Sequence, residues 1–264
     1  MKKLIILAAI VLALVVLLVL GQEPREQPGQ TPAPQPAQKA APAQPEVRPV
    51  TLGQLMPDFT LPALDGSQVT LSALRGRNVL IIFPRGYAAE NYWCTICQYR
   101  YAELVRRELR DKVRQKYGME VLFILPYAKD IVQKWLDIVP EQLENIKKTK
   151  NPADPSSLDE NGRRRVERYK QIYPLDIAPA DIEVKPGEMA RPFPVLYDAD
   201  RALTKRLGIF ATEWGGSKID QGIPTVFIVD RAGTLQFKYI GQNTVDRPSY
   251  DYIFKFLDCL NAGK

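Results

Sequence analysis

Two cysteines three positions apart are the residues of this chain best suited to chemistry. Cys94 and Cys97 stand at the start of a predicted helix over residues 94–117, where apolar residues recur at helical spacing. A helix N-terminus stabilises a thiolate and can lower a thiol pKa from about 8.5 to about 7 or below. We therefore expect Cys94 to attack a disulfide and Cys97 to resolve the mixed disulfide. Trp93, directly before Cys94, would form an apolar wall beside a partner.

The absence of histidine and the small number of cysteines exclude several kinds of active site. The 264 residues include no histidine, which excludes a Ser–His–Asp triad, a Cys–His protease pair and a zinc site with histidine ligands. A zinc site at the pair would need four ligands, and Cys259 is the third and last cysteine. Covalent haem attachment needs a histidine after the second cysteine, where this chain has Gln98. We expect no metal and no other cofactor, and a purely structural disulfide remains an alternative to redox chemistry.

The charge of the chain bears on its partners. Thirty-six Lys and Arg residues against 30 Asp and Glu give a net charge of +6, spread diffusely along the sequence. Nucleic-acid binding needs a clustered basic face, so no nucleic-acid partner is expected. The expected partner is a protein or small-molecule disulfide or thiol, with a peroxide as the alternative, and the sequence does not identify the electron donor.

Strands alternate with helices along the chain, which is typical of α/β domains. Apolar runs predict strands at 78–83, 120–125, 193–197, 225–230 and 235–240. Further helices are predicted over 129–150 with a break at Pro140, over 200–207, and from Ser249 onward. A hairpin is expected over 59–71 with its turn at Asp65-Gly66, whereas residues 151–191, rich in Pro, Asp and charge, are expected to have little regular structure.

A second motif lies far from the cysteines, at Gly222-Ile223-Pro224-Thr225 before a predicted strand. Here the sequence resembles the thioredoxin superfamily, in which such a turn holds a cis-proline facing the Cys-x-x-Cys pair. The segments 57–61, 71–76, 193–198 and 230–234, with Asp246-Arg247-Pro248-Ser249 before the last helix, resemble the redoxin and alkyl hydroperoxide reductase/thiol-specific antioxidant family. The resemblance implies a thioredoxin-like fold for residues 51–264: a central mixed sheet flanked by helices, an N-terminal hairpin, and an insertion at about 128–191.

The resemblance also implies roles for residues around the pair. A cis bond at Pro224 would bring the Ile223 backbone opposite Cys94, where an extended partner could pair with it. Arg85 would stabilise the Cys94 thiolate, unless it is an ordinary surface arginine. Cys259, beside the apolar stripe of the last helix, is expected to be a packed hydrophobic residue, with a resolving role as the alternative.

The chain departs from peroxiredoxins, which carry a Pro-x-x-x-Thr/Ser-x-x-Cys motif. Pro84 precedes Cys94 by ten positions and Asn91 occupies the hydroxyl position, so disulfide exchange is favoured over peroxide reduction. Arg85-Gly86 and Trp93-Cys94 instead resemble an Arg-Gly-x-Trp-Cys-x-x-Cys variant with a short insertion. Three hypotheses follow: a membrane-tethered thiol–disulfide oxidoreductase, a thiol peroxidase with Cys94 as the peroxidatic residue, and a tethered binding module.

The N-terminal residues predict the compartment. Lys2-Lys3 is followed by residues 4–20, which carry no charged or polar side chain, so residues 1–21 are expected to be a membrane anchor or a cleaved signal peptide. Residues 22–50 hold eight prolines and are expected to form a semi-rigid linker. We expect a single-pass protein with its domain on the extracytoplasmic, periplasmic side of the cell membrane, or a secreted domain.

Overall fold

The computed structural model describes residues 50–185 and 187–263. All of them belong to one of the two compact units into which the chain divides, the unit Pro45–Lys264. The predicted anchor or signal segment, and the linker up to residue 49, lie outside the described residues. Within the described part of the chain, no helix is long and apolar enough to cross a membrane.

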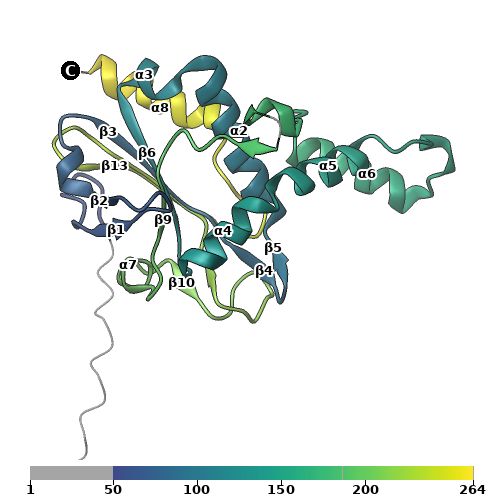
Figure 1. Ribbon diagram of the computed structural model, residues 1–264, viewed down its shortest axis with the longest axis horizontal. Helices are drawn as coiled ribbons and strands as arrows, with labels where there is room; N and C mark the ends of the chain where they lie inside the picture. The colour runs from purple at the N-terminus through teal and green to yellow at the C-terminus, as the bar shows by residue number, and fades with distance from the viewer. Residues whose placement is uncertain (1–49, 186, 264) are drawn as a thin grey trace, which may run out of the picture. The chain divides into compact units, whose positions relative to one another are not determined.

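A five-stranded mixed sheet lies at the centre, in the order β13-β12-β3-β6-β9 (Figure 1). β3 (Asn78–Phe83), β6 (Met119–Leu125) and β9 (Val195–Tyr197) are parallel. β12 (Thr225–Val229) runs antiparallel to β3 and to β13 (Leu235–Ile240). Every residue of β3 and β12 is buried, because elements cover both faces of the sheet, and this explains why these strands are apolar apart from their first residues, Asn78 and Thr225. The predicted α/β fold with a central mixed sheet is confirmed.

Alternate residues of β3 face opposite sides of the sheet, as the two-residue repeat of a strand requires. Leu80 and Ile82 belong to one core cluster, which includes the buried residues of the long helices, whereas Val79 and Ile81 belong to the other. The helices of the first cluster are α2 (Thr95–Asp111), α3 (Val113–Tyr117), α4 (Lys129–Asp137), α5 (Val139–Lys150) and α8 (Tyr250–Ala262). The second face is covered by β1 (Thr60–Pro62), β2 (Gln68–Thr70), the 3-10 helix η1 (Leu71–Leu74) and α7 (Ala202–Arg206).

The predicted positions of the helices and the hairpin are largely confirmed. β1 and β2 pair antiparallel across the expected turn, and Ser249 caps α8 by accepting a hydrogen bond from Tyr252 N–H. The helix predicted over 94–117 is divided at Lys112, which takes left-handed backbone angles between α2 and α3. The break expected near Pro140 separates α4 from α5, and Pro140 lies in the first turn of α5, where a missing N–H does no harm.

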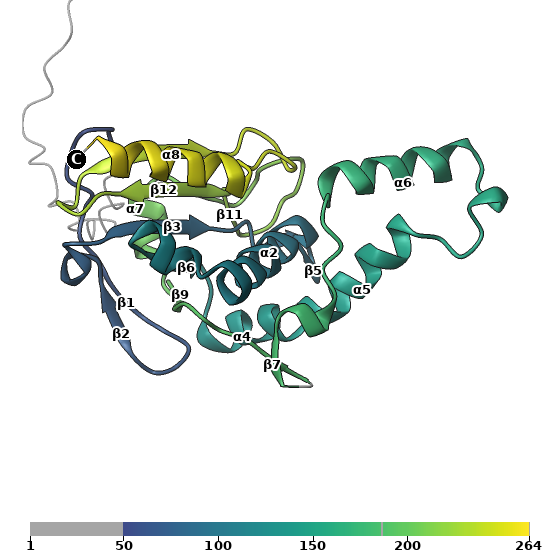
Figure 2. The ribbon, with the colours of Figure 1, turned by 90° about the horizontal axis from the view of Figure 1, so that it is seen from above.

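The prediction of little regular structure in residues 151–191 is wrong. This segment contains α6 (Glu160–Ile172), the hairpin β7 (Glu183–Lys185) and β8 (Glu188–Met189), and the short 3-10 helices η2 (Pro155–Ser157) and η3 (Pro179–Asp181). The aspartates that suggested a loop begin helices instead: Asp159, for example, caps α6 by accepting a hydrogen bond from Gly162 N–H. No residue of α6 is buried, so its apolar periodicity is too weak to predict it. α6 runs beside α5 and both extend beyond the sheet (Figure 2).

Candidate active site

The cysteine pair lies at the junction between β5 and α2. β4 (Tyr87–Ala89) and β5 (Tyr92–Trp93) form a small hairpin, after which Cys94 is the N-cap of α2 and Cys97 lies in its first turn. Both thiols are free, and their sulfurs are 2.8 Å apart, within hydrogen-bonding distance. Cys94 is 4% exposed and Cys97 is 2% exposed. The spacing of the two cysteines therefore produces a buried, closely coupled dithiol.

Two donors from different elements point at the sulfurs. The backbone N–H of Arg85, just after β3, donates to Cys97 Sγ at 3.3 Å. Arg247, in the segment before α8, brings Nη2 to 3.5 Å from Cys97 Sγ and 3.8 Å from Cys94 Sγ. Its Nη1 donates to the carbonyl of Asp246 at 2.7 Å, which orients the guanidinium. Both donors favour a negatively charged sulfur.

These donors and the shared hydrogen bond separate the pKa values of the two thiols. Burial opposes ionisation of Cys97, but the hydrogen bond with Cys94, the charge of Arg247 and the hydrogen bond from Arg247 together lower the pKa of Cys97 to about 5. The hydrogen bond with Cys97, followed by burial, raises the pKa of Cys94 well above its ordinary value. Cys97 receives both the Arg85 N–H and the shorter contact with Arg247, which favours its thiolate, whereas the expected effect of the helix N-terminus on Cys94 stays a prediction.

Arg247 was not among the residues predicted for the site. It lies about 150 positions beyond the cysteines in the sequence, and only the fold brings it to them. The segment Asp246-Arg247-Pro248-Ser249 had supported the family resemblance, and that was the signal that pointed to this position.

Arg85 lies at the site, where its charge interacts with Cys94 and Cys97, while its side-chain hydrogen bonds go to other residues. The side chain is buried and donates to Gln221 Oε1 (2.6 Å), Ser217 Oγ (2.9 Å) and the Ala88 carbonyl (3.2 Å). The guanidinium also lies 5.3 Å from the centroid of the Trp214 ring. The Arg85 side chain thus anchors the loop between β10 (Phe210–Ala211) and β11 (Gln221–Gly222), while its backbone N–H donates to Cys97 Sγ.

Trp93 forms part of an aromatic cluster beside the pair. Its ring stacks on Tyr87 with centroids 3.8 Å apart and meets Tyr127 edge-on at 6.2 Å. The Tyr127 hydroxyl accepts a hydrogen bond from Tyr87 N–H at 3.0 Å and lies 3.3 Å from the Arg85 carbonyl, to which it can donate. Burial raises the pKa of Tyr127, so this hydroxyl stays protonated. The apolar wall expected from Trp93 is present, and the cluster holds the β4–β5 hairpin over the site.

Pro224 lies near the pair, but not in the expected form. Pro224, Cys97 and Arg247 line a cavity of about 30 Å³ in the core. The described backbone contains no cis peptide bond, so the predicted cis Ile223–Pro224 bond is wrong. The extended chain passes directly from β11 to β12, with Ile223 N–H donating to the Ile209 carbonyl (2.7 Å) and the Pro224 carbonyl accepting from Gly241 N–H (2.8 Å). Because Ile223 N–H is already bonded, the predicted pairing of this backbone with a partner chain is not supported.

Cys259 is exposed on α8, so the prediction of a packed hydrophobic residue is wrong. It faces away from the buried stripe of the helix, whose buried residues are Tyr250, Ile253, Phe254 and Leu257. Across the described residues, no group of three or more Cys, His, Asp or Glu side chains lies close enough together to hold a metal ion.

The fold and the dithiol define a thioredoxin-like, thiol-based redox protein. Residues 52–143, which include both cysteines of the pair, match the model of the AhpC/TSA family. The family resemblance seen in the sequence is thereby confirmed.

Solved peroxiredoxin structures are similar to the chain at 15% sequence identity. A cysteine-to-serine mutant of peroxiredoxin 6 from Arenicola marina has a TM-score of 0.50 over 80% of this chain and 74% of its own. AhpC from Mycobacterium bovis has a TM-score of 0.49 over 82% and 96%, and the reduced 2-Cys peroxiredoxin of Plasmodium vivax 0.48 over 80% and 97%. At this identity the first likeness establishes the fold alone. No curated protein sequence matches the chain.

Proposed function

We propose that the protein is a thiol–disulfide oxidoreductase that uses the Cys94–Cys97 dithiol. One observation carries the proposal: two free sulfurs lie 2.8 Å apart, under a guanidinium that contacts both. Such a pair forms a thiolate readily, and its sulfurs can join in a disulfide after modest rearrangement.

The proposed reaction moves two electrons from the dithiol to a substrate disulfide. Cys94 transfers its proton to the Cys97 thiolate across their hydrogen bond and attacks one sulfur of the substrate disulfide. The other substrate sulfur leaves and takes up the proton from Cys97. The Cys97 thiolate then attacks Cys94 in the mixed disulfide, which leaves a Cys94–Cys97 disulfide and releases the second substrate sulfur as a thiolate that takes a proton from water. The same steps in reverse oxidise a dithiol substrate.

We assign the attack to Cys94 because it stands on the loop side of the helix, directly after half-buried Trp93 and exposed Tyr92. Cys97 lies one turn into α2 and lines a small pocket with Pro224. We assign resolution to this second sulfur.

Trapping experiments test the function and the order of attack together. In a Cys259→Ser background, Cys97→Ser should accumulate mixed disulfides with a reporter disulfide, whereas Cys94→Ser should not, because only the first retains the attacking thiol. The wild-type pair should catalyse insulin reduction by dithiothreitol. Equal trapping by both variants would overturn the order, and an inactive wild-type pair whose disulfide resists dithiothreitol would overturn the function in favour of a binding module.

A thiol peroxidase is the second candidate, and the burial of both sulfurs favours it. A hydroperoxide is small enough to reach the sulfur of a residue that is only 4% exposed, whereas a folded protein disulfide would need the residues that cover the pair to move. The Cys94 thiolate would take one peroxide oxygen to become a sulfenic acid and release an alcohol or water, after which Cys97 would form the disulfide and release water. Consumption of hydrogen peroxide faster than insulin reduction would favour this candidate.

We also propose that the domain is held outside the cytoplasm by the N-terminal segment. The support is the pair of lysines before the apolar residues 4–20 and the proline-rich linker that follows. The full-length chain should sediment with membranes, resist carbonate extraction and be digested by protease added from the extracytoplasmic side. A full-length chain in the cytoplasmic fraction would contradict this.

A further inference from the structure

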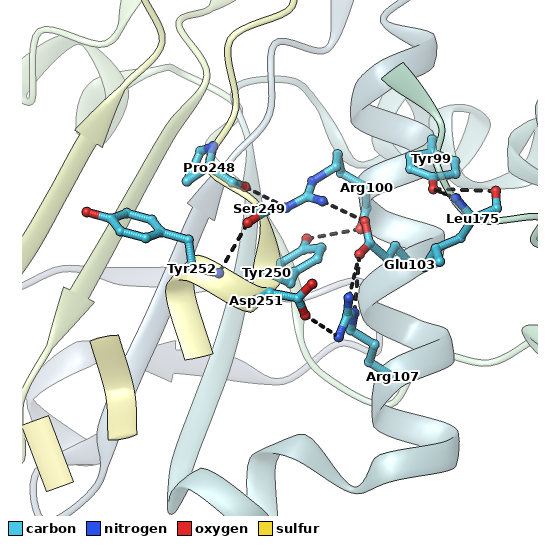
Figure 3. Close-up of polar contacts among 10 residues, drawn as sticks. All are labelled: Tyr99, Arg100, Glu103, Arg107, Leu175, Pro248, Ser249, Tyr250, Asp251 and Tyr252. Atoms are coloured by element: carbon cyan, nitrogen blue, oxygen red, sulfur yellow. Dashed lines mark hydrogen bonds and ion pairs between the residues drawn. The ribbon is translucent and has the colours of Figure 1, made fainter. Parts of the chain in front are cut away.

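The segment that carries Arg247 is attached to helix α2 by Arg100. Arg100 Nη2 donates to the Pro248 carbonyl at 2.6 Å (Figure 3). The Arg100 guanidinium also lies over the Tyr250 ring, 3.9 Å from its centroid, and the Tyr250 hydroxyl donates to the Arg100 carbonyl at 3.0 Å. Arg100 therefore contacts the residues on both sides of Ser249, the N-cap of α8.

Arg100 is itself held in one orientation by buried charge. Glu103 accepts from Arg100 Nη1 at 2.6 Å, and its side chain is only 4% exposed. Arg107 donates to the other oxygen of Glu103 and pairs with Asp251 of α8 at 3.0 Å (Figure 3). Because Glu103 accepts directly from Arg100 Nη1, the Arg100 guanidinium is held against Pro248.

Arg100 is close to the two sulfurs along both segments that it joins. Arg100 lies one turn beyond Cys97 on the same helix, and Pro248 directly follows Arg247 in the chain. Arg100, Cys97, Arg247 and Pro248 also line the same small cavity. We propose that Arg100 is a positioning residue, which holds the Arg247 guanidinium against the Cys94–Cys97 pair by fixing the peptide that follows Arg247. This inference deepens the proposed function and rests on it.

Other contacts around Arg247 tie it to different elements. Arg247 Nη1 donates to the carbonyl of Asp246, which belongs to the same segment. The Asp246 carboxylate accepts hydrogen bonds from the Tyr239 hydroxyl and from Gln242 N–H, on the β13 side. Neither contact links Arg247 to α2. The other α8 contacts with α2, from the Tyr250 hydroxyl to the Arg100 carbonyl and from Asp251 to Arg107, lie beyond Pro248, so without the Arg100 side chain the peptide that follows Arg247 loses its direct hydrogen bond to α2.

The charged and titratable groups around the pair come from four elements. Besides Arg247, the pair is close to Arg85 after β3, Tyr127 after β6 and Tyr173 after α6. The groups around Arg100 are Glu103, Arg107, Tyr250 and Asp251. Among these, Arg107 shares the network but donates to Glu103 and Asp251 rather than to the 246–248 segment, which makes it the matched control.

The test measures the apparent pKa of the pair from thiolate absorbance near 240 nm, in a Cys259→Ser background. Arg100→Gln should raise this pKa by about 1 unit, a tenfold change in the ionisation constant, because Arg247 withdraws from the sulfurs. Arg107→Gln should leave it within about 0.3 unit, although it removes a comparable ion pair. Arg100→Lys, which keeps one donor, should shift it in the same direction by less.

A double variant separates positioning from general loosening. In an Arg247→Gln background, Arg100→Gln should cause no further shift, since the charge that Arg100 positions is gone. The inference is overturned if folded Arg100→Gln keeps the wild-type pKa, if Arg107→Gln shifts it equally, or if the two shifts add. Should Arg100→Gln not fold, the same comparison with Arg100→Lys decides. Failure of disulfide exchange by the wild-type pair would count against the proposed function alone, because the ionisation measurement needs no substrate.

Discussion

Replacing Arg247 by glutamine tests the electrostatic basis of the site. Arg247 Nη2 lies 3.5 and 3.8 Å from the two sulfurs. Two unit charges about 4 Å apart interact by about 1 kcal/mol in water and about 4 kcal/mol at an effective dielectric constant of 20. At about 1.4 kcal/mol per unit, this corresponds to a pKa shift of about 1 to 3 units. Since the positive charge stabilises the thiolate, its removal must raise the pKa of the pair.

The assay follows the thiolate directly. In reduced Cys259→Ser protein, titration of the absorbance near 240 nm should show one thiol of the pair ionising with a pKa of about 5. In Arg247→Gln this step should move upward by about 1 to 3 units, and alkylation by iodoacetamide at pH 6 should slow by at least about tenfold. Arg247→Lys keeps the charge without the planar fork and should lie between the two.

A control separates the charge from the fold. Arg77 forms an ion pair with Glu120 at the exposed surface, so Arg77→Gln removes one positive charge far from the sulfurs and should leave the titration unchanged. If folded Arg247→Gln ionises within about 0.5 unit of wild type, the low pKa does not come from this contact, and the electrostatic reasoning fails.

Further predictions concern protons, packing and the hairpin over the site. Because Cys97 ionises at a pKa of about 5, disulfide reduction takes up two protons below that pH and one above it. The reduction potential measured against glutathione should therefore change slope from about 60 to about 30 mV per pH unit as pH rises through 5, and an unbroken slope of about 60 mV to pH 8 would contradict the assignment. Gly86→Ala should lower the free energy of unfolding in urea by about 2 kcal/mol or more, because φ is +75° and the new Cβ would lie 2.2 Å from the Tyr127 ring. Gly66→Ala, at φ +90° with open space around it, should cost only the backbone strain, and equal losses would refute the clash. Tyr127→Phe should cost about 1–2 kcal/mol by leaving Tyr87 N–H unpaired, and an unchanged urea midpoint would contradict this.

The central sheet could be predicted because its strands are buried on both faces. Residues 79–83 are a continuous apolar run, and the structure places β3 at Asn78–Phe83. Residues 160–172 could not be assigned in this way. α6 buries none of its side chains, so its helical character depends on the Asp159 cap and on packing beside α5, which an apolar pattern does not reveal.

The error at Pro224 has a different origin. The sequence motif predicted the position of the proline correctly, since Pro224 and Cys97 line one cavity. The isomer of the preceding bond depends on where the neighbouring backbone finds its hydrogen bonds, and here Ile223 N–H is bonded to Ile209. Ile209 lies just before β10, outside the motif 222–225, so the motif alone does not reveal this hydrogen bond.

The donors that surround the cysteine pair could not be predicted from the motif for a related reason. The helix N-terminus is a local effect worth up to about 1 kcal/mol at an exposed site, and it favours Cys94, the N-cap. A backbone N–H donates to Cys97 Sγ at 3.3 Å, and a guanidinium lies 3.5 Å from Cys97 Sγ and 3.8 Å from Cys94 Sγ. These two donors lie 12 residues before and 150 residues after Cys97. Spacing within the motif thus determines which sulfurs meet, whereas the topology of the sheet, which brings the end of β3 and the start of α8 together, determines which donors reach the sulfurs.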